Sequence, residues 1–275
     1  MIEHLNELLI IADMDNTLLT AKYGIPSCNI ETIKLFCALG GNFTVASGRT
    51  VESISRYLDV LPITAPAIAY GGGMIYDFQN KRAIESYNIK KQDAKRATLE
   101  IMEKFPHIGV EIMAENGKIY VIRANEYTYK HTVYEKLSYV NCCLDDIKCG
   151  WLKILFAGSA IEMKKTAEFA YSLYYPSLCF IPTNDIYFEI MPQNITKGTA
   201  LYSLCKLLNI KKENVIAIGD YYNDIPLFKE AGYSVAMRSS PCEVKLEANE
   251  ITDDCVYGGV GQFIYKLIKE NASFE

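Results

Sequence analysis

Four short apolar runs, each followed at once by small or polar residues, constrain the fold of this 275-residue chain more than any other feature. The runs cover residues 8–12, 43–46, 67–70 and 215–218. Runs of this length are typical of strands that are buried on both faces. Helical patterns lie between or after them, at residues 29–39, 51–58, 198–208 and 226–231. Strands that alternate with helices predict an α/β fold, with a Rossmann-like parallel sheet flanked by helices.

Residues 81–190 have a different pattern, which predicts antiparallel strands. The dipeptide Asn116-Gly117 between two strand-like segments favours a tight hairpin turn of the primed type. Those two strands are expected at residues 109–114 and 118–124. Apolar residues at spacings of three and four also predict a helix with one apolar face at residues 92–105.

The chain is therefore predicted to form two domains. Residues 1–80 and 191–275 would build the parallel-sheet core, and residues 81–190 would form an α+β domain inserted into it. Hydrophobic residues make up 50% of the chain, which is enough for one large apolar core and a smaller second one.

The charge balance and the N-terminal segment argue against several classes of function. With 28 basic and 33 acidic residues, the net charge of −5 offers no cationic field for a nucleic acid. The first nine residues lack the features of a signal peptide, and no apolar run approaches the roughly 20 residues that cross a bilayer. We expect a cytoplasmic protein that has neither a nucleic acid nor a membrane as a partner.

Polar residues stand directly after three of the predicted strands. Because all strands of a parallel sheet end at the same edge, Asp13, Ser47 and Asp220 should converge in one crevice. Other polar residues close to these positions in the sequence, or at the start of a predicted helix, are Asp15, Lys197, Asn223 and Asp224. The expected result is a cluster of carboxylates with one lysine and one hydroxyl.

Such a cluster needs a cation, because the three carboxylates of Asp13, Asp220 and Asp224 would repel one another. Ligands that are all oxygen select a hard cation, and Mg²⁺ also shares its coordination shell readily with a phosphate. With Mg²⁺ and Lys197 present, a phosphate ester could approach, and Asp13 could attack phosphorus. Asp15 could then protonate the leaving oxygen and later activate water.

Each of these residues also has a simpler interpretation. Asp13 and Asp15 could cap a turn, Ser47 could cap a helix, and Asp224 could cap the helix that begins near Pro226. Lys197 is harder to explain in this way: it follows the expected N-cap Thr196, where the helix dipole disfavours a cation by about 0.3–1 kcal/mol. For Arg49, a surface salt bridge and a contact to substrate are both open.

At these positions the chain resembles the haloacid dehalogenase superfamily of phosphatases that form an aspartyl phosphate. The four motifs, in order, are Asp13-Met14-Asp15-Asn16-Thr17, Ser47-Gly48-Arg49, Lys197-Gly198 and Gly219-Asp220-Tyr221-Tyr222-Asn223-Asp224. The inserted domain resembles the cap of subclass IIB in its position and in its pattern of antiparallel strands and helix. Cof-type sugar phosphatases are the most similar group.

The resemblance implies a role for each matching residue. Asp13 would be the nucleophile and a Mg²⁺ ligand, and Asp15 the acid/base and a main-chain metal ligand. Asp220 would be the distal metal carboxylate, with Asp224 supporting it. The phosphate or substrate would be held by Ser47, Lys197, Asn223, Arg49 and the backbone N–H groups of Met14 and Gly48.

The resemblance also implies a function, and two alternatives remain open. It implies a phosphatase that hydrolyses a small phosphorylated metabolite, such as a sugar phosphate. A phosphomutase of the same superfamily and a noncatalytic protein that binds a phosphometabolite are the alternatives. Three positions depart from the common pattern: Asn16 replaces a glycine but tolerates a left-handed backbone, while Gly71 and Arg238 could alter substrate selection.

Overall fold

The computed structural model describes residues 5–20, 22–134 and 136–272, which form two compact units. The core unit contains the chain up to Arg49, Ile54–Ile84 and the chain from Thr196 onward. The cap unit contains Thr50–Ser53 and Glu85–Ile195. The divisions predicted from the sequence fall after residues 80 and 190.

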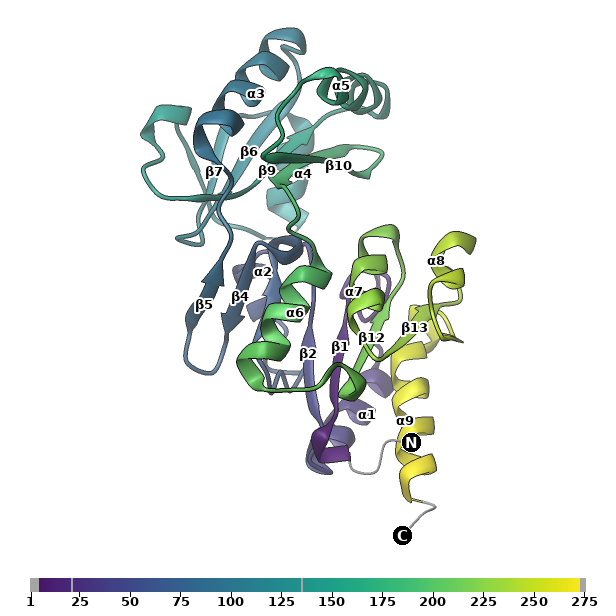
Figure 1. The fold of residues 1–275 in the computed structure, drawn as a ribbon. Coiled ribbons are helices and arrows are strands. Elements are labelled where there is room, and N and C mark those ends of the chain that lie inside the picture. The colour runs from purple at the N-terminus through teal and green to yellow at the C-terminus, as the bar shows by residue number, and fades with distance from the viewer. Residues whose placement is uncertain (1–4, 21, 135, 273–275) are drawn as a thin grey trace. The chain divides into compact units, whose positions relative to one another are not determined.

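The core unit is built on a parallel sheet of five strands in the order β14-β13-β12-β1-β2 (Figure 1). The strands are β1 (Leu9–Ala12), β2 (Asn42–Val45), β12 (Val215–Gly219), β13 (Tyr233–Met237) and β14 (Glu250–Thr252). Within the sheet, Ala12 at the end of β1 lies opposite Val45 of β2 and Ile218 of β12. The segments that follow these three strands therefore emerge at one edge, and the predicted α/β fold is confirmed.

The third apolar run forms a strand but not a member of the parallel sheet, which corrects the prediction. β3 (Ala67–Ala69) pairs antiparallel with β4 (Met74–Asp77) in a separate sheet that β5 (Arg82–Ser86) completes. Among the described residues, one bridge between Ala46 and Ile68 joins it to the end of β2. The chain reverses directly after β3 because Tyr70, Gly71 and Gly72 all have positive φ (54°, 69° and 113°).

Helices cover both faces of the parallel sheet. They are α1 (Ser27–Ala38), α6 (Lys197–Leu208), α7 (Ile225–Glu230), α8 (Cys242–Leu246) and α9 (Gly259–Ala272), while α2 (Val51–Ser55) begins among the residues of the cap unit and ends in the core unit. Leu9 and Ile11 pack against α6 and α7, while Ile10 between them is buried on the other face. The helix expected at residues 51–58 ends at Ser55, because Tyr57 and Leu58 donate to carbonyls three residues back, as in a turn.

The cap unit is a six-stranded sheet in the order β10-β11-β9-β6-β7-β8, antiparallel except for the β7–β8 pair. Its strands are β6 (Gly109–Ala114), β7 (Ile119–Arg123), β8 (Tyr139–Asn141), β9 (Trp151–Ala157), β10 (Leu178–Asn184) and β11 (Tyr187–Pro192). Its helices are α3 (Lys91–Lys104), α4 (Glu126–Tyr134) and α5 (Ala160–Ser172). The predicted mixture of antiparallel strands and helices is present.

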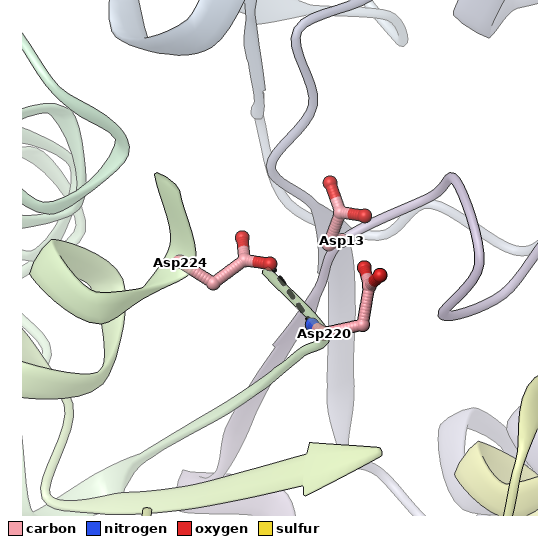
Figure 2. A group of neighbouring side chains, drawn as sticks. All are labelled: Asp13, Asp220 and Asp224. Atoms are coloured by element: carbon pink, nitrogen blue, oxygen red, sulfur yellow. Dashed lines mark hydrogen bonds between the residues drawn. The ribbon is translucent and has the colours of Figure 1, made fainter. Parts of the chain in front are cut away.

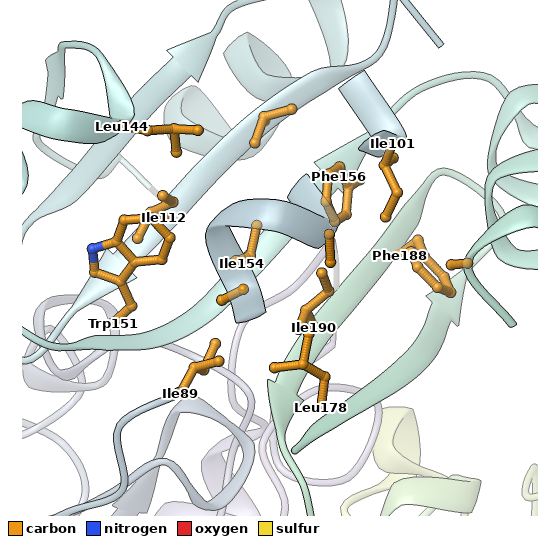
Figure 3. Close-up of a cluster of buried hydrophobic side chains, with 14 of the residues drawn as sticks. Ile89, Ile101, Ile112, Leu144, Trp151, Ile154, Phe156, Leu178, Phe188 and Ile190 are labelled. Carbon is orange, nitrogen blue, oxygen red and sulfur yellow. The ribbon is translucent and has the colours of Figure 1, made fainter. Parts of the chain in front are cut away.

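One face of the cap sheet carries an apolar core (Figure 3). The apolar stripe of α3, with Ala94, Ala97 and Ile101 fully buried, packs there against side chains such as Trp151 and Phe156. Burying side chains of this size contributes roughly 1.5–3 kcal/mol each. The helix expected at residues 92–105 is thus held to the sheet by the face that its spacing predicted.

The β6–β7 hairpin does not have the primed turn that Asn116-Gly117 suggested. Ala114 N–H donates to the Lys118 carbonyl, and Gly117 N–H donates to the Ala114 carbonyl. The loop therefore has three residues, and within it Gly117 has positive φ (78°) while Asn116 does not. This is the geometry of a type I turn followed by one left-handed residue. A primed turn of two residues needs positive φ at both Asn116 and Gly117, whereas this loop of three residues needs it at Gly117 alone.

Candidate active site

The residues after β1, β2 and β12 meet at one edge of the core sheet. Asp13 follows β1, and its backbone N–H donates to the Ile218 carbonyl of β12 at 2.8 Å. Ser47 lies just after β2 and is fully buried, and Asp220 follows β12 directly. The structure brings these three predicted residues together because their strands are parallel and in register.

Asp13, Asp220 and Asp224 form a buried acidic cluster (Figure 2). Each offers a carboxylate oxygen, and these oxygens all lie within 4.8 Å of one another. Their exposed fractions are 6%, 9% and 0%. Carboxylates this close and this well buried destabilise one another in the ionised form unless positive charge lies among them.

Lys197 supplies part of that positive charge. Its Nζ lies 2.5 Å from Asp13 Oδ1 and 2.7 Å from Asp224 Oδ1, and the side chain is 1% exposed. Burial alone would lower the pKa of Lys197, but the Asp13 and Asp224 carboxylates outweigh it and raise that pKa. The lysine is the first residue of α6, after the N-cap Thr196, whose hydroxyl accepts from the Thr199 N–H. The predicted cap is confirmed, and the carboxylates explain why a cation is stable at this helix start.

The single lysine does not neutralise the cluster. Burial raises the pKa of Asp13 well above its ordinary value, and the Asp224 and Asp220 carboxylates raise it further against the opposing effect of Lys197. Burial, with help from Asp224, also raises the pKa of Asp220 to about 6. A divalent cation would stabilise both ionised carboxylates, and oxygen ligands are the ones that Mg²⁺ prefers.

Asp224 does not cap the helix that follows it, which excludes the simpler interpretation of this residue. Its carboxylate turns back instead and accepts from the backbone N–H groups of Asp220 (3.0 Å) and Tyr221 (3.1 Å), in addition to Lys197. A Cβ atom at Gly219 would lie 2.5 Å from the Asp224 carboxyl carbon, so only glycine leaves room for it. Asp224 thus holds Lys197 and the turn after Asp220 in place, and it also offers one of the three clustered carboxylate oxygens.

Asp15 and Arg49 form an ion pair at the edge of the cluster. Arg49 Nε donates to Asp15 Oδ2 at 2.9 Å, and Arg49 Nη2 donates to Asp15 Oδ1 at 2.7 Å. Asp15 is half exposed, and Asn16 directly after it has the left-handed φ (59°) expected for an asparagine at this turn. Of the two interpretations of Arg49, the salt bridge is present, but the arginine is buried and not on the surface.

The other predicted phosphate-binding residues lie in three segments. Ser47 Oγ accepts from the Arg49 N–H at 3.2 Å, and a Cβ atom at Gly48 would meet open space. Met14 is buried. Asn223 is exposed in the short 3-10 turn Tyr222–Asp224. The segments after β1, β2 and β12 thus contain them all.

Two residues near the cluster, Thr17 and Cys255, were missed by the sequence analysis. Arg238, which departs from the family pattern, lies outside the cluster. Thr17 Oγ1 donates to Asp220 Oδ1 at 3.0 Å, and its place in the first motif was the available signal. Burial, followed by the Asp220 and Asp13 carboxylates, raises the pKa of Cys255 to about 12, so its thiol stays protonated. The exposed Arg238 pairs with Asp253 at 3.2 Å.

The described part of the chain contains no helix that is both long and apolar enough to cross a membrane.

Curated relatives match the chain over nearly its whole length. The 5-amino-6-(5-phospho-D-ribitylamino)uracil phosphatase YwtE of Bacillus subtilis is 25% identical and is covered over 97% of its length, with 94% of this chain. The pyridoxal phosphate phosphatase YbhA of Escherichia coli is 24% identical, with the same coverage of 94% and 97%. Both alignments include the core and the cap.

Solved structures show the same fold. A haloacid dehalogenase-like hydrolase from Bacteroides thetaiotaomicron has a TM-score of 0.85 and 26% identity, and the match covers 94% of this chain and 99% of that one. A subclass IIB sugar phosphatase of the same superfamily has a TM-score of 0.79 at 20% identity, covering 94% and 98%.

A sequence model of one family spans both units. It matches residues 10–264, a range that begins within β1, includes all four motifs and ends within α9. The chain belongs to the haloacid dehalogenase-like hydrolases.

Proposed function

We propose that this hydrolase is a Mg²⁺-dependent phosphatase that acts on a small phosphorylated metabolite through an aspartyl phosphate on Asp13. The observation that carries the proposal is the buried contact of Asp13 with Lys197, beside the acidic side chain of Asp220. The relatives described above are named as phosphatases of phosphorylated small molecules, which supports the substrate class.

The residues present fit a bound magnesium ion. Asp13, Asp220 and the main chain of Asp15 would hold it, with Asp224 and Thr17 keeping the acidic side chains in place. When bound, the ion would neutralise carboxylates and polarise the phosphoryl group. This charge compensation lets an anionic nucleophile and an anionic ester come together.

The chain's own residues carry the proposed steps. An oxygen of Asp13 attacks phosphorus as the bond to the ester oxygen breaks, and Asp15 gives its proton to that oxygen. The Asp15 carboxylate then takes a proton from the water that attacks the aspartyl phosphate, which frees phosphate and Asp13. Lys197, Ser47, Asn223 and the N–H groups of Met14 and Gly48 would hold the phosphoryl oxygens.

The substitution Asp13→Asn tests the proposal. It keeps the shape of the side chain and removes the nucleophile, so turnover of an aryl phosphate with Mg²⁺ should fall at least about 10⁴-fold. Circular dichroism and thermal melting should show an intact fold. An Asp13→Asn variant that is folded and as fast as the wild type would refute the mechanism.

The same assays separate the alternatives. A phosphatase releases free phosphate, which a colour assay detects, whereas a phosphomutase returns the phosphoryl group to a bound intermediate. A noncatalytic binding protein would bind phosphorylated compounds without turning over any of them. A panel of phosphorylated sugars, nucleotides and cofactors would then define the substrate, and the reaction predicts equal amounts of phosphate and dephosphorylated product.

A further inference from the structure

Arg49 makes an unusual contact for a residue expected to bind substrate. Its guanidinium binds both carboxylate oxygens of Asp15, at 2.9 and 2.7 Å. The arginine side chain is 7% exposed, whereas the Asp15 side chain is 53% exposed. A paired contact of this kind fixes both the position and the plane of a carboxyl group, which a single hydrogen bond cannot do.

Further contacts hold Arg49 in place. The Arg49 N–H donates to Ser47 Oγ at 3.2 Å, and the Arg49 carbonyl accepts from the Tyr70 N–H at 2.9 Å. The guanidinium carbon also lies 6.0 Å from the centre of the Tyr57 ring. The arginine is therefore held by contacts to Ser47, Tyr57 and Tyr70, while Asp15 belongs to the segment after β1.

Asp15 depends on this arginine for its orientation. Within the described ranges, its carboxylate accepts hydrogen bonds from the Arg49 side chain and from no other side chain. A half-exposed aspartate without such a partner would sample several rotamers in water. Proton transfer in turn requires the donor to lie within hydrogen-bond reach of the reacting oxygen.

We infer that Arg49 is a positioning residue that orients Asp15 for proton transfer and does not itself hold the phosphoryl group. The inference rests on the proposed function. One carboxyl oxygen of Asp15 can stay on the guanidinium while the other gives its proton to the ester oxygen as the phosphorus–oxygen bond breaks. In the second half of the reaction, the same oxygen takes the proton of the attacking water.

This role has a kinetic signature that depends on the leaving group. An alkyl phosphate expels a strongly basic alkoxide, so its cleavage depends on the proton from Asp15. A nitrophenyl phosphate expels a weakly basic phenolate and needs little protonation. A residue that acts through Asp15 should therefore matter far more for the alkyl ester, whereas a phosphate contact should matter equally for both.

The experiment compares Arg49→Met and Arg49→Lys on p-nitrophenyl phosphate and on glycerol 2-phosphate, with Mg²⁺. For Arg49→Met we expect kcat to fall about 100-fold on the alkyl ester and less than about fivefold on the aryl ester, with KM changed less than about threefold on each. Arg49→Lys should recover part of the alkyl activity. Added guanidinium ion should also restore activity to Arg49→Met, which it could not do for a purely structural defect.

Two comparisons make the test specific. The exposed Arg56, in the turn after α2, provides a matched control, and Arg56→Met should leave both activities unchanged. Asp15→Asn should show the same dependence on the leaving group, and the double variant should lose no more than Asp15→Asn alone, because both changes remove one function.

Other outcomes overturn the inference. An equal rise of KM on both esters would make Arg49 a phosphate contact. A lower melting temperature with unchanged kinetics would make it structural. If the wild type is active and depends on Asp13, either outcome defeats only the role of Arg49; if Asp13→Asn remains fully active, the proposed function fails as well.

Discussion

Both units of this hydrolase bury charged side chains, but they balance the charges differently. In the core, three carboxylates share one ammonium group, that of Lys197. In the cap, the buried Glu111 lies 2.7 Å from His131, and Glu189, whose side chain is 13% exposed, lies 2.9 Å from Lys153.

Glu111 and Glu189 lie on the face of the cap sheet that is opposite its apolar core. Glu111 and Glu189 both lie opposite Leu155 of β9, so they share one face of the sheet, while Val110, Phe156 and Phe188 face the apolar core on the other side. A buried charge that has lost its water must find a partner within the protein. The two cap glutamates have such partners within the cap, whereas the core cluster has three carboxylates for one ammonium group.

Replacing Lys197 in the core and Lys153 in the cap should give the largest difference between the two units. Lys197→Met leaves three carboxylates without an ammonium group, so we expect kcat on p-nitrophenyl phosphate to fall about 10³-fold. In metal-free protein the free energy of unfolding should also fall by about 3–5 kcal/mol, as measured by urea denaturation. The matched variant Lys153→Met removes the cap pair and should lower stability while keeping aryl-phosphate activity within about threefold. Equal loss of activity in the two variants would contradict the distinction between the units.

The pH dependence of magnesium binding tests whether the clustered carboxylates of the core bind the ion. A carboxyl group must lose its proton before it binds Mg²⁺, and burial raises the pKa of Asp220 to about 6. Mg²⁺ affinity should therefore weaken as the pH falls through about 6, and the raised pKa of Asp13 acts in the same direction. Calorimetric titration at pH 7.5 and pH 5 measures the change. An affinity that is the same at both pH values would show that the acidic excess in the core is not what binds the ion.

The smallest effect is expected at Thr17. Thr17→Val keeps the shape of the side chain and removes the hydrogen bond to Asp220, a loss of about 1 kcal/mol or about fivefold in Mg²⁺ affinity. The hydrogen bond also lowers the pKa of Asp220, so the pH at which Mg²⁺ binding weakens should move upward. Thr20→Val, which removes a hydroxyl bonded to the Gly24 carbonyl, is the control and should leave Mg²⁺ affinity unchanged.

Much of the fold and of the candidate site could be predicted because both depend on local pattern. Apolar runs identified β1, β2 and β12, and parallel strands necessarily end at one edge, which placed Asp13, Ser47 and Asp220 together. Thr196 was recognised as an N-cap for the same reason, since a cap depends on the residues next to it. The roles proposed for these residues remain predictions until the variants are measured.

The errors arose where several local solutions have similar energies. A short apolar strand such as β3 fits a parallel or an antiparallel neighbour, and the reversal at Tyr70 brings β4 beside it, so that β3 keeps one parallel bridge to Ala46 and pairs along its length with β4. A loop with Asn116-Gly117 can close with two or three residues, and the register of the cap strands selected three.

The sequence by itself determined which chemical groups stand at the ends of the core strands, because strand pattern and motif order depend on neighbouring residues. Only the tertiary structure decided which of those groups pair. Asp224 turns back to Lys197, and Arg49 binds Asp15, because the segments that follow separate strands come within hydrogen-bond distance. Hydrogen bonds and charge interactions act over a few ångströms, and such distances between remote residues exist only once the sheet has formed.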